Sequence, residues 1–422
     1  MVDIDSAAHG AHLDRQIDLL WPDYVDLLRA VTAVPSFAGD EAPAQELLAV
    51  QARTADLETD LWQVDLGGLA AHEDFASADT SLQARPNLTA ILRGRGGGRS
   101  IAISGHIDVV PLGPARLWTE DPWQGRVEGD RLYGRGTLDM KGGLVAGLLA
   151  THAIAASGLP HRGDIVFESV IEEESTGNGT LAARQRGPLV DAALIPEVSG
   201  EDVQIANPGV IWFEVTLTGK PAYVGLAGAS VNAIDLAVDL IAHLRSIPPR
   251  LNQQFNHPAY DGVTQPLTLN AGTIRGGDWQ SNVPLECVIG FRLAFPLEWS
   301  VAQARDTVIA AVAEFAAARP WLAECPPEIR WNGFQAHGYA IAPDAPLVSM
   351  LRSHVEHVSG APSRVSAMFG TADARYFGDQ GIPAVYYGPS GGGMHAPDEW
   401  VSLDSVKRVA RVIARTALEW TA

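Results

Sequence analysis

The chain has 422 residues, of which 46% are hydrophobic and 19% charged, a composition typical of a globular protein with two domains. The net charge of −20 disfavours nucleic acid and anionic membranes as partners. Cys287 and Cys325 are too few for a disulfide framework, no apolar run is long enough to span a membrane, and residues 1–5 lack the features of a secretory signal. We therefore expect a cytoplasmic protein.

Predicted helices and strands alternate along the first 200 residues. Residues 13–53 predict two amphipathic helices with a break at 34–41. Short runs rich in β-branched residues predict strands at 87–92, 100–104, 165–171 and 192–196. This alternation is typical of an α/β fold with a mainly parallel sheet flanked by helices.

The pattern changes near residue 207. The next elements are expected in the order strand, helix, strand, strand, helix, strand, at 210–219, 232–246, 267–274, 287–295, 301–318 and 328–334. That order is the ferredoxin-like α+β signature. A helix at 346–358 and a strand at 384–387 return to the α/β pattern. We predict one domain from residues 1–206 and 335–422, with residues 207–334 inserted as a smaller domain.

Three acidic residues, Glu172, Glu173 and Glu174, directly follow the strand at 165–171. In open α/β sheets, ligands bind at the carboxyl ends of the strands. Adjacent strand residues point to opposite faces, so neighbouring glutamates can have different roles, one binding a cation and the next transferring a proton. A solvated acidic turn is the alternative when this tripeptide is considered alone.

Five further polar residues are expected at strand ends or in adjacent loops. His106 and Asp108 share one face at a strand end, as suits a metal-binding imidazole and a carboxylate that orients it. Asp139 follows a glycine-rich turn at a helix start, Glu197 follows a strand, and His395 ends a glycine-rich loop. Each of these residues taken alone is also compatible with an ordinary surface position.

Together these segments provide two imidazoles and three carboxylates as potential metal ligands: His106, Asp139, Glu174, Glu197 and His395. Such donors suit two divalent cations, zinc in the first place, with cobalt and manganese as alternatives. A carboxylate can bridge two metals about 3.5–4 Å apart, and such a pair activates water and polarises a carbonyl. Glu173, beside the ligand Glu174, is then the natural general base.

Six ordered motifs resemble those of the co-catalytic zinc hydrolases that include acetylornithine deacetylase, succinyl-diaminopimelate desuccinylase, aminoacylases and glutamate carboxypeptidases. The resemblance runs over nearly the whole chain. The motifs are PSFAGDE at 35–41, RPN at 85–87, SGHIDVVP at 104–111, YGRGTLDMKGG at 133–143, VIEEESTGNGT at 170–180 and MHAPDE at 394–399.

The resemblance implies a specific division of the ligands. One zinc ion would be held by His106, Asp139 and Glu197, and the other by Asp139, Glu174 and His395. Asp139 would therefore bridge the two ions, and the peptide bond that follows it, to Met140, would be cis.

The resemblance also implies the reaction and the assembly. Asp108 would brace His106, zinc-bound hydroxide would attack an amide, and Glu173 would deprotonate the water and pass the proton to the departing amine. The inserted domain would be a lid over the site and the surface through which a homodimer forms.

One position departs from the family pattern. The family generally has a histidine in the inserted domain, just before a glycine-rich turn and an Asn-Ala-Ile helix start, and this histidine donates to the oxyanion in the partner's active site. Tyr223 occupies that position here. A tyrosine hydroxyl is a donor that stays neutral near pH 7, so Tyr223 either replaces the histidine as donor or has a structural role.

Two further residues match substrate contacts of the family. Asn282 corresponds to an asparagine that contacts substrate. Arg292 lies on a predicted strand of the inserted domain, where relatives have an arginine for a substrate carboxylate, a role suited to its fork of donors. A salt bridge at the rim of the domain is the alternative for Arg292. Arg375 is a further candidate for the same carboxylate.

These observations predict a metal-dependent hydrolase that removes the acyl group from a small N-acyl amino acid or related N-acyl amine. A di- or aminopeptidase with the same two metals is the alternative, and its substrate would have a free amine. A catalytically silent relative that binds a ligand between its domains is a third hypothesis, which the loss of the lid histidine permits. The retention of Glu173 and of all five ligand types argues against it.

Overall fold

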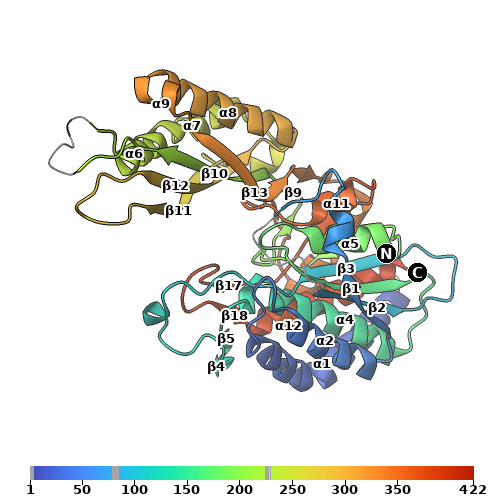
Figure 1. Ribbon diagram of the computed structural model, residues 1–422. Coiled ribbons are helices and arrows are strands. Elements are labelled where there is room, and N and C mark those ends of the chain that lie inside the picture. The colour runs from blue at the N-terminus through green and yellow to red at the C-terminus, as the bar shows by residue number, and fades with distance from the viewer. Residues whose placement is uncertain (1–3, 78–84, 224–227, 229) are drawn as a thin grey trace.

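The computed structural model describes residues 4–77, 85–223, 228 and 230–422, and shows two bodies of secondary structure (Figure 1). The larger body contains an eight-stranded sheet, whose strands in spatial order are β1 (Glu58–Val64), β2 (Arg85–Leu92), β6 (Ile165–Val170), β3 (Ile101–His106), β7 (Ala193–Ile195), β16 (Ala384–Tyr386), β8 (Val203–Gln204) and β15 (Val365–Ser366). Neighbours from β6 to β16 run parallel, whereas β1 and β2 pair antiparallel at one edge. The α/β prediction is confirmed, with a mixed rather than uniformly parallel sheet.

Helices cover both faces of this sheet (Figure 1). One face packs against α1 (Ile4–Thr32), α2 (Ala42–Thr54), α4 (Gly142–Ser157), α10 (Pro346–Ser359) and α12 (Leu403–Trp420). On the other side lie α3 (Leu66–Leu69), α5 (Asn178–Arg186) and α11 (Ala374–Gly378). Alternation along β3 explains the two layers, because Ile101 and Ile103 belong to the core under α4 while Ala102 faces the core that contains Phe377 of α11. None of the described helices has the length and apolar composition needed to cross a bilayer.

The smaller body is an α+β domain with its own core. Its elements in chain order are β10 (Gly209–Thr218), α6 (Ala233–Leu244), α7 (Ile247–Gln254), β11 (Leu269–Gly276), β12 (Glu286–Phe295), α8 (Val301–Ala317), α9 (Pro320–Glu324) and β13 (Glu328–Ala336). The sheet order β11-β12-β10-β13, antiparallel throughout, is the ferredoxin-like arrangement expected from the sequence. Alternate residues of β10, among them Phe213, Val215 and Leu217, are buried in this core.

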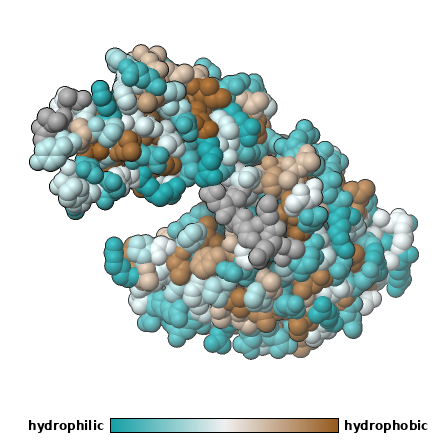
Figure 2. All heavy atoms as spheres, viewed as in Figure 1, coloured by the Kyte–Doolittle hydropathy of each residue, from teal (hydrophilic) through white to brown (hydrophobic). Residues whose placement is uncertain are grey.

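The chain enters and leaves the inserted domain at one place. There β9 (Ala206–Asn207) pairs antiparallel with β14 (Tyr339–Ala340). Tyr260 of the inserted domain also packs against Ala206 and Ala367 of the larger body, and its hydroxyl donates to the carbonyl of Met368 at 2.8 Å. Figure 2 shows a wide cleft between the two bodies on one side. A second small sheet of the larger body consists of β17 (Gly391–Gly392), β18 (Trp400–Ser402), β5 (Arg131–Tyr133) and β4 (Arg126–Glu128).

A close backbone contact between Gly143 and Pro196 fixes the distance between the start of α4 and the end of β7. Gly143, in the first turn of α4, lies directly against the backbone carbonyl of Pro196, just past the end of β7. A methyl group on Gly143 would overlap that carbonyl oxygen, and backbone cannot rotate away as a side chain can. The contact therefore sets the position of residue 197, which follows Pro196.

Replacing Gly143 with alanine should lower the free energy of unfolding by about 2 kcal/mol or more, because the added methyl group forces α4 and the 196–197 backbone apart. Chemical denaturation of the purified variant measures this. Gly272→Ala is the matched control, since its methyl group would meet only the side-chain nitrogen of Asn270 at 3.4 Å. Equal stability of the two variants would contradict the proposed role of the contact.

Candidate active site

All five predicted ligand residues converge at the carboxyl edge of the large sheet. His106 is the last residue of β3, Glu174 lies four residues past β6, and Glu197 lies two residues past β7. These three strands are adjacent, so their ends meet. Asp139 precedes α4 and His395 follows β17, and both reach the same place.

Asp139 lies between the two imidazoles. Its Oδ1 is 3.3 Å from Nε2 of His106, and its Oδ2 is 3.1 Å from Nε2 of His395. Glu197 approaches the same nitrogen of His106 at 3.5 Å, and Glu174 approaches the same nitrogen of His395 at 3.3 Å. Each oxygen of Asp139 thus belongs to a different histidine–glutamate pair. The peptide bond between Asp139 and Met140 is cis, as the resemblance implied.

The site concentrates negative charge in a buried space. Burial raises the pKa of Glu173 and Glu174, and raises that of Glu197 to about 8. Burial alone would lower the pKa of His395, but its contacts with Asp139 and Glu174 raise it to about 11. These directions all reflect a shortage of positive charge around the carboxylates.

The donor atoms present fit divalent cations. Atoms of His106, Glu173 and Glu197, and likewise atoms of His106, Asp139 and Glu174, lie within 4.8 Å of one another. Oε1 of Glu173 is buried without a hydrogen-bond partner in the described part of the chain. Buried carboxylate oxygens beside imidazole nitrogens are the donor set that zinc and similar metals prefer.

The carboxylate of Asp108 organises the loop that carries the glutamates. It accepts the backbone N–H groups of Glu173 and Glu174, each at 3.0 Å. The imidazole of His106 instead has its Nδ1 2.9 Å from the backbone carbonyl of Asp108, with the carboxylate 3.5 Å away. The orientation of His106 is therefore fixed mainly by the backbone carbonyl of Asp108, because the Asp108 carboxylate points towards the loop that carries Glu173 and Glu174.

Buried ion pairs hold the next layer of this loop. Glu172 has a positive φ of 63°, a strained conformation for a non-glycine residue, and its carboxylate lies 3.2 Å from Arg85. Arg85 also pairs with Glu41 at 2.8 Å. Asn87 accepts the N–H of Ile171 through its side-chain oxygen at 3.0 Å. The motifs at 35–41 and 85–87 thus shape the backbone beneath the site.

Glu399 is a buried organiser of the site to which the sequence reasoning assigned no role. Its carboxylate accepts the backbone N–H groups of Gly136, Leu138 and Asp139 at 2.9–3.1 Å, and pairs with Arg135 at 2.5 Å. Four donors on one carboxylate fix the turn that presents Asp139. The only signal in the sequence was the position of Glu399 inside the motif that contains His395.

The predicted substrate contacts on the inserted domain lie apart from this cluster. Tyr223 is 69% exposed and pairs through backbone with Asn282, and neither residue lines the cavity at the ligand cluster. Arg292 lies on β12 and is half-buried, and burial lowers its pKa. Among the described residues Arg292 pairs with no carboxylate, its nearest polar partner being Oγ1 of Thr268 at 3.5 Å, so the rim salt bridge is absent.

Arg375 is committed to internal contacts. It is 2% exposed and donates to the carbonyl of Thr176 at 3.1 Å and to the hydroxyl of Tyr376 at 2.8 Å. The bond to Thr176 fastens α11 to the loop after the glutamates. The contacts favour a structural role for Arg375 over a contact with a substrate carboxylate.

A cavity of about 190 Å³ opens directly onto the ligand cluster. Asp139, Glu173, Glu174 and Glu197 form its polar wall. Its apolar wall includes Phe369 and Met394, which are 56% and 52% exposed. The space is small and carries both polar and apolar surface, as a pocket for a compact ligand does.

Comparison with known sequences identifies relatives along almost the entire chain. The model of peptidase family M20/M25/M40 matches residues 102–419. The succinyl-diaminopimelate desuccinylase of Methylocella silvestris is 29% identical over 401 residues, which cover 92% of this chain and 96% of the relative. An N-formyl-4-amino-5-aminomethyl-2-methylpyrimidine deformylase of Halalkalibacterium halodurans is 24% identical over 431 residues, covering 97% and 96%.

Solved structures share the fold. A di-peptidase of Saccharomyces cerevisiae superposes with a TM-score of 0.77 at 14% identity, and human carnosine dipeptidase 1 with 0.74 at 16%; each comparison covers 98% of both chains. The family match, the convergent ligand geometry and the two-domain fold agree with one another. The chain belongs to peptidase family M20/M25/M40 and is a metal-dependent hydrolase of amide bonds.

Proposed function

We propose that the protein removes the acyl group from a small N-acyl amino acid or a related N-acyl amine. The observation that carries this proposal is the position of Asp139, whose two oxygens face two different histidines at 3.3 and 3.1 Å. A carboxylate placed in this way suits a bridge between two metal ions. The desuccinylase and deformylase names of the two relatives support acyl removal as the reaction.

Two zinc ions fit the donors present. We assign His106, Asp139 and Glu197 to one ion and Asp139, Glu174 and His395 to the other. When bound, the pair would supply a Lewis acid for the amide carbonyl and lower the pKa of water. Asp108 and Glu399 act one layer further out, since each fixes the backbone that presents ligand residues.

Glu173 is the proposed general base. Its Oε2 lies 3.8 Å from the imidazole of His106, its Oε1 has no hydrogen-bond partner in the described residues, and the side chain lines the cavity. The unpartnered oxygen can accept a proton from water and return it to the departing amine nitrogen. The neighbouring Glu174 is assigned a different role, that of a metal ligand, because its side chain approaches His395.

The inserted domain is the proposed source of substrate contacts. The guanidinium of Arg292, which pairs with no carboxylate among the described residues, is a candidate for a substrate carboxylate. Asn282 and the exposed Tyr223 are candidates for donors when the cleft between the domains closes. A homodimer through this domain remains a prediction. Residues 224–227 and 229, which follow Tyr223, lie outside the described part of the chain.

A di- or aminopeptidase is the second candidate. The observation that favours it is the similarity of the fold to two dipeptidases, at TM-scores of 0.77 and 0.74. Their identities of 14% and 16% are well below the 29% of the desuccinylase, and a shared fold does not specify the substrate. We therefore place acyl removal first.

Metal-stripped protein titrated with zinc should gain hydrolase activity towards N-acetyl, N-formyl and N-succinyl amino acids, because the catalytic water needs the metals. Amine release is measured for each compound, with matched free dipeptides in parallel. Turnover of the dipeptides alone would replace the deacylase by the peptidase. No turnover of any compound, despite metal uptake at Asp139, would support the silent ligand-binding relative.

Replacing Glu173 with alanine should lower kcat by about 10²–10⁴-fold, because the proton acceptor is lost while the ligand set remains. Replacing Glu174 with alanine should instead weaken binding of one metal ion, since it removes the carboxylate beside His395. Steady-state kinetics and metal content of both variants distinguish the two roles. Full activity of the Glu173 variant would exclude it as the base.

Replacing Asp108 with asparagine should weaken metal binding about 10–100-fold, since an amide can accept only one of the two backbone N–H groups that the carboxylate holds. Competition with a chromophoric chelator measures the affinity. The matched control is Asp65→Asn, because the Asp65 side chain also accepts a backbone N–H, that of Gly68 at 2.9 Å, but belongs to neither the ligand cluster nor the cavity lining. Equal affinities in both variants would show that Asp108 does not position the ligands.

A further inference from the structure

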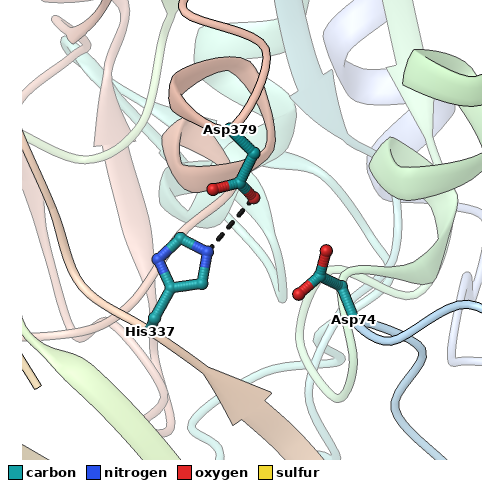
Figure 3. A group of neighbouring side chains, drawn as sticks. All are labelled: Asp74, His337 and Asp379. Atoms are coloured by element: carbon teal, nitrogen blue, oxygen red, sulfur yellow. Dashed lines mark hydrogen bonds and ion pairs between the residues drawn. The ribbon is translucent and has the colours of Figure 1, made fainter. Parts of the chain in front are cut away.

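A second group of potential ligand atoms lies outside the active site. Asp74, His337 and Asp379 each contribute one donor atom, and the three atoms lie within 4.8 Å of one another. In Figure 3 both carboxylates and the imidazole point towards a common space. None of these three residues belongs to a motif in the sequence analysis or lines the active-site cavity.

The three residues come from three separate segments. Asp74 lies in the loop after α3, His337 lies between β13 and β14, and Asp379 directly follows α11. The loop that carries Asp74 is held in place, because the side chain of Asn178 bonds both the N–H and the carbonyl of Ala76, at 3.2 and 2.8 Å. The cluster therefore sits where the chain leaves the inserted domain.

The orientation of His337 favours a cation in this space. Its Nδ1 lies 2.9 Å from the carbonyl of Gly338, an acceptor only, so Nδ1 carries the proton. Nε2 then faces Oδ2 of Asp379 at 3.1 Å. A neutral imidazole would direct a lone pair at a carboxylate, an arrangement that requires either a second proton or a metal ion between the two atoms.

No basic side chain compensates the two carboxylates. Within the described residues, neither Asp74 nor Asp379 pairs with lysine or arginine. His72 is 3.7 Å from the Asp74 carboxylate, but its Nδ1 accepts the backbone N–H of Asp74 and is not available as a donor. Burial and the charge of Asp379 raise the pKa of Asp74. The positive charge that these two carboxylates need therefore comes either from a second proton on His337, whose pKa Asp379 raises, or from a bound cation.

We propose that Asp74, His337 and Asp379 bind one divalent transition-metal ion, such as zinc or manganese, in addition to the active-site pair. One nitrogen and two oxygen donors suit these ions. The side chains are 31–40% exposed, which leaves water access to complete the coordination. The separation of 3.1 Å between Nε2 and Oδ2 also equals that between His395 and Asp139 in the active site.

Such an ion would have a structural consequence. It would fasten the segment between β13 and β14 to α11 and to the loop after α3, and so attach one of the two connections of the inserted domain to the larger body. The other connection, at β9, would be unaffected. The ion would thereby limit how far the inserted domain can turn.

The test is metal stoichiometry of the full-length protein titrated with zinc after stripping. We expect about three ions per chain, and one fewer in Asp74→Asn and in His337→Gln. The matched control is His354→Gln, because His354 lies 2.8 Å from a single carboxylate, Glu419, and should retain all three ions. Equal stoichiometry in the wild type, both cluster variants and the control would overturn the proposal.

A further variant distinguishes metal binding at this cluster from metal binding at the active site. Asp139→Asn should lose active-site binding yet retain the ion at the Asp74 cluster, and zinc should raise its unfolding temperature. The double variant with Asp74→Asn should show no such rise. A rise that persists in the double variant would contradict the proposal, whereas failure of the active site to bind zinc would affect only the proposed function.

Discussion

The structure depends on holding four carboxylates together in one buried space. Asp139, Glu173, Glu174 and Glu197 all line the active-site cavity. Two like charges 4 Å apart repel each other by about 4 kcal/mol at the effective dielectric of a protein surface. The repulsion energy is larger for charges that are more deeply buried. Such a site persists only if the backbone around it is fixed, because any freedom would let the carboxylates separate.

Backbone N–H groups provide that fixation, and further carboxylates hold the N–H groups. Asp108 accepts from the glutamate loop, and Glu399 accepts from the turn of Asp139. Arg135 then neutralises Glu399, and Arg85 lies between Glu41 and Glu172. The cluster residues are thus held through backbone N–H groups by a second set of carboxylates, and arginines neutralise carboxylates behind them.

Local sequence patterns indicated which residues meet at the site, but not most of the contacts that hold their backbone. His106, Glu174 and Glu197 each follow a strand recognisable from its β-branched residues, and parallel strands bring such ends together. The contact of Glu399 with Leu138 joins residues 261 positions apart, and no periodicity indicates such a pairing. Spacing suggested that the Asp108 side chain braces His106, whereas the path of the chain presents the carbonyl instead. No motif indicated the cluster of Asp74, His337 and Asp379, because three segments far apart in the sequence form it.

The pairing of β9 with β14 has a consequence for how this protein can diversify. The inserted domain begins and ends at two adjacent strands, so it is an insertion that leaves the path of the chain through the larger body uninterrupted. Its core, from Val210 to Ala336, shares no residue with that of the large sheet. Mutations confined to this core therefore leave the carboxyl edge of the sheet intact. Ligand preference and hydrolytic chemistry can evolve at separate rates within a single polypeptide.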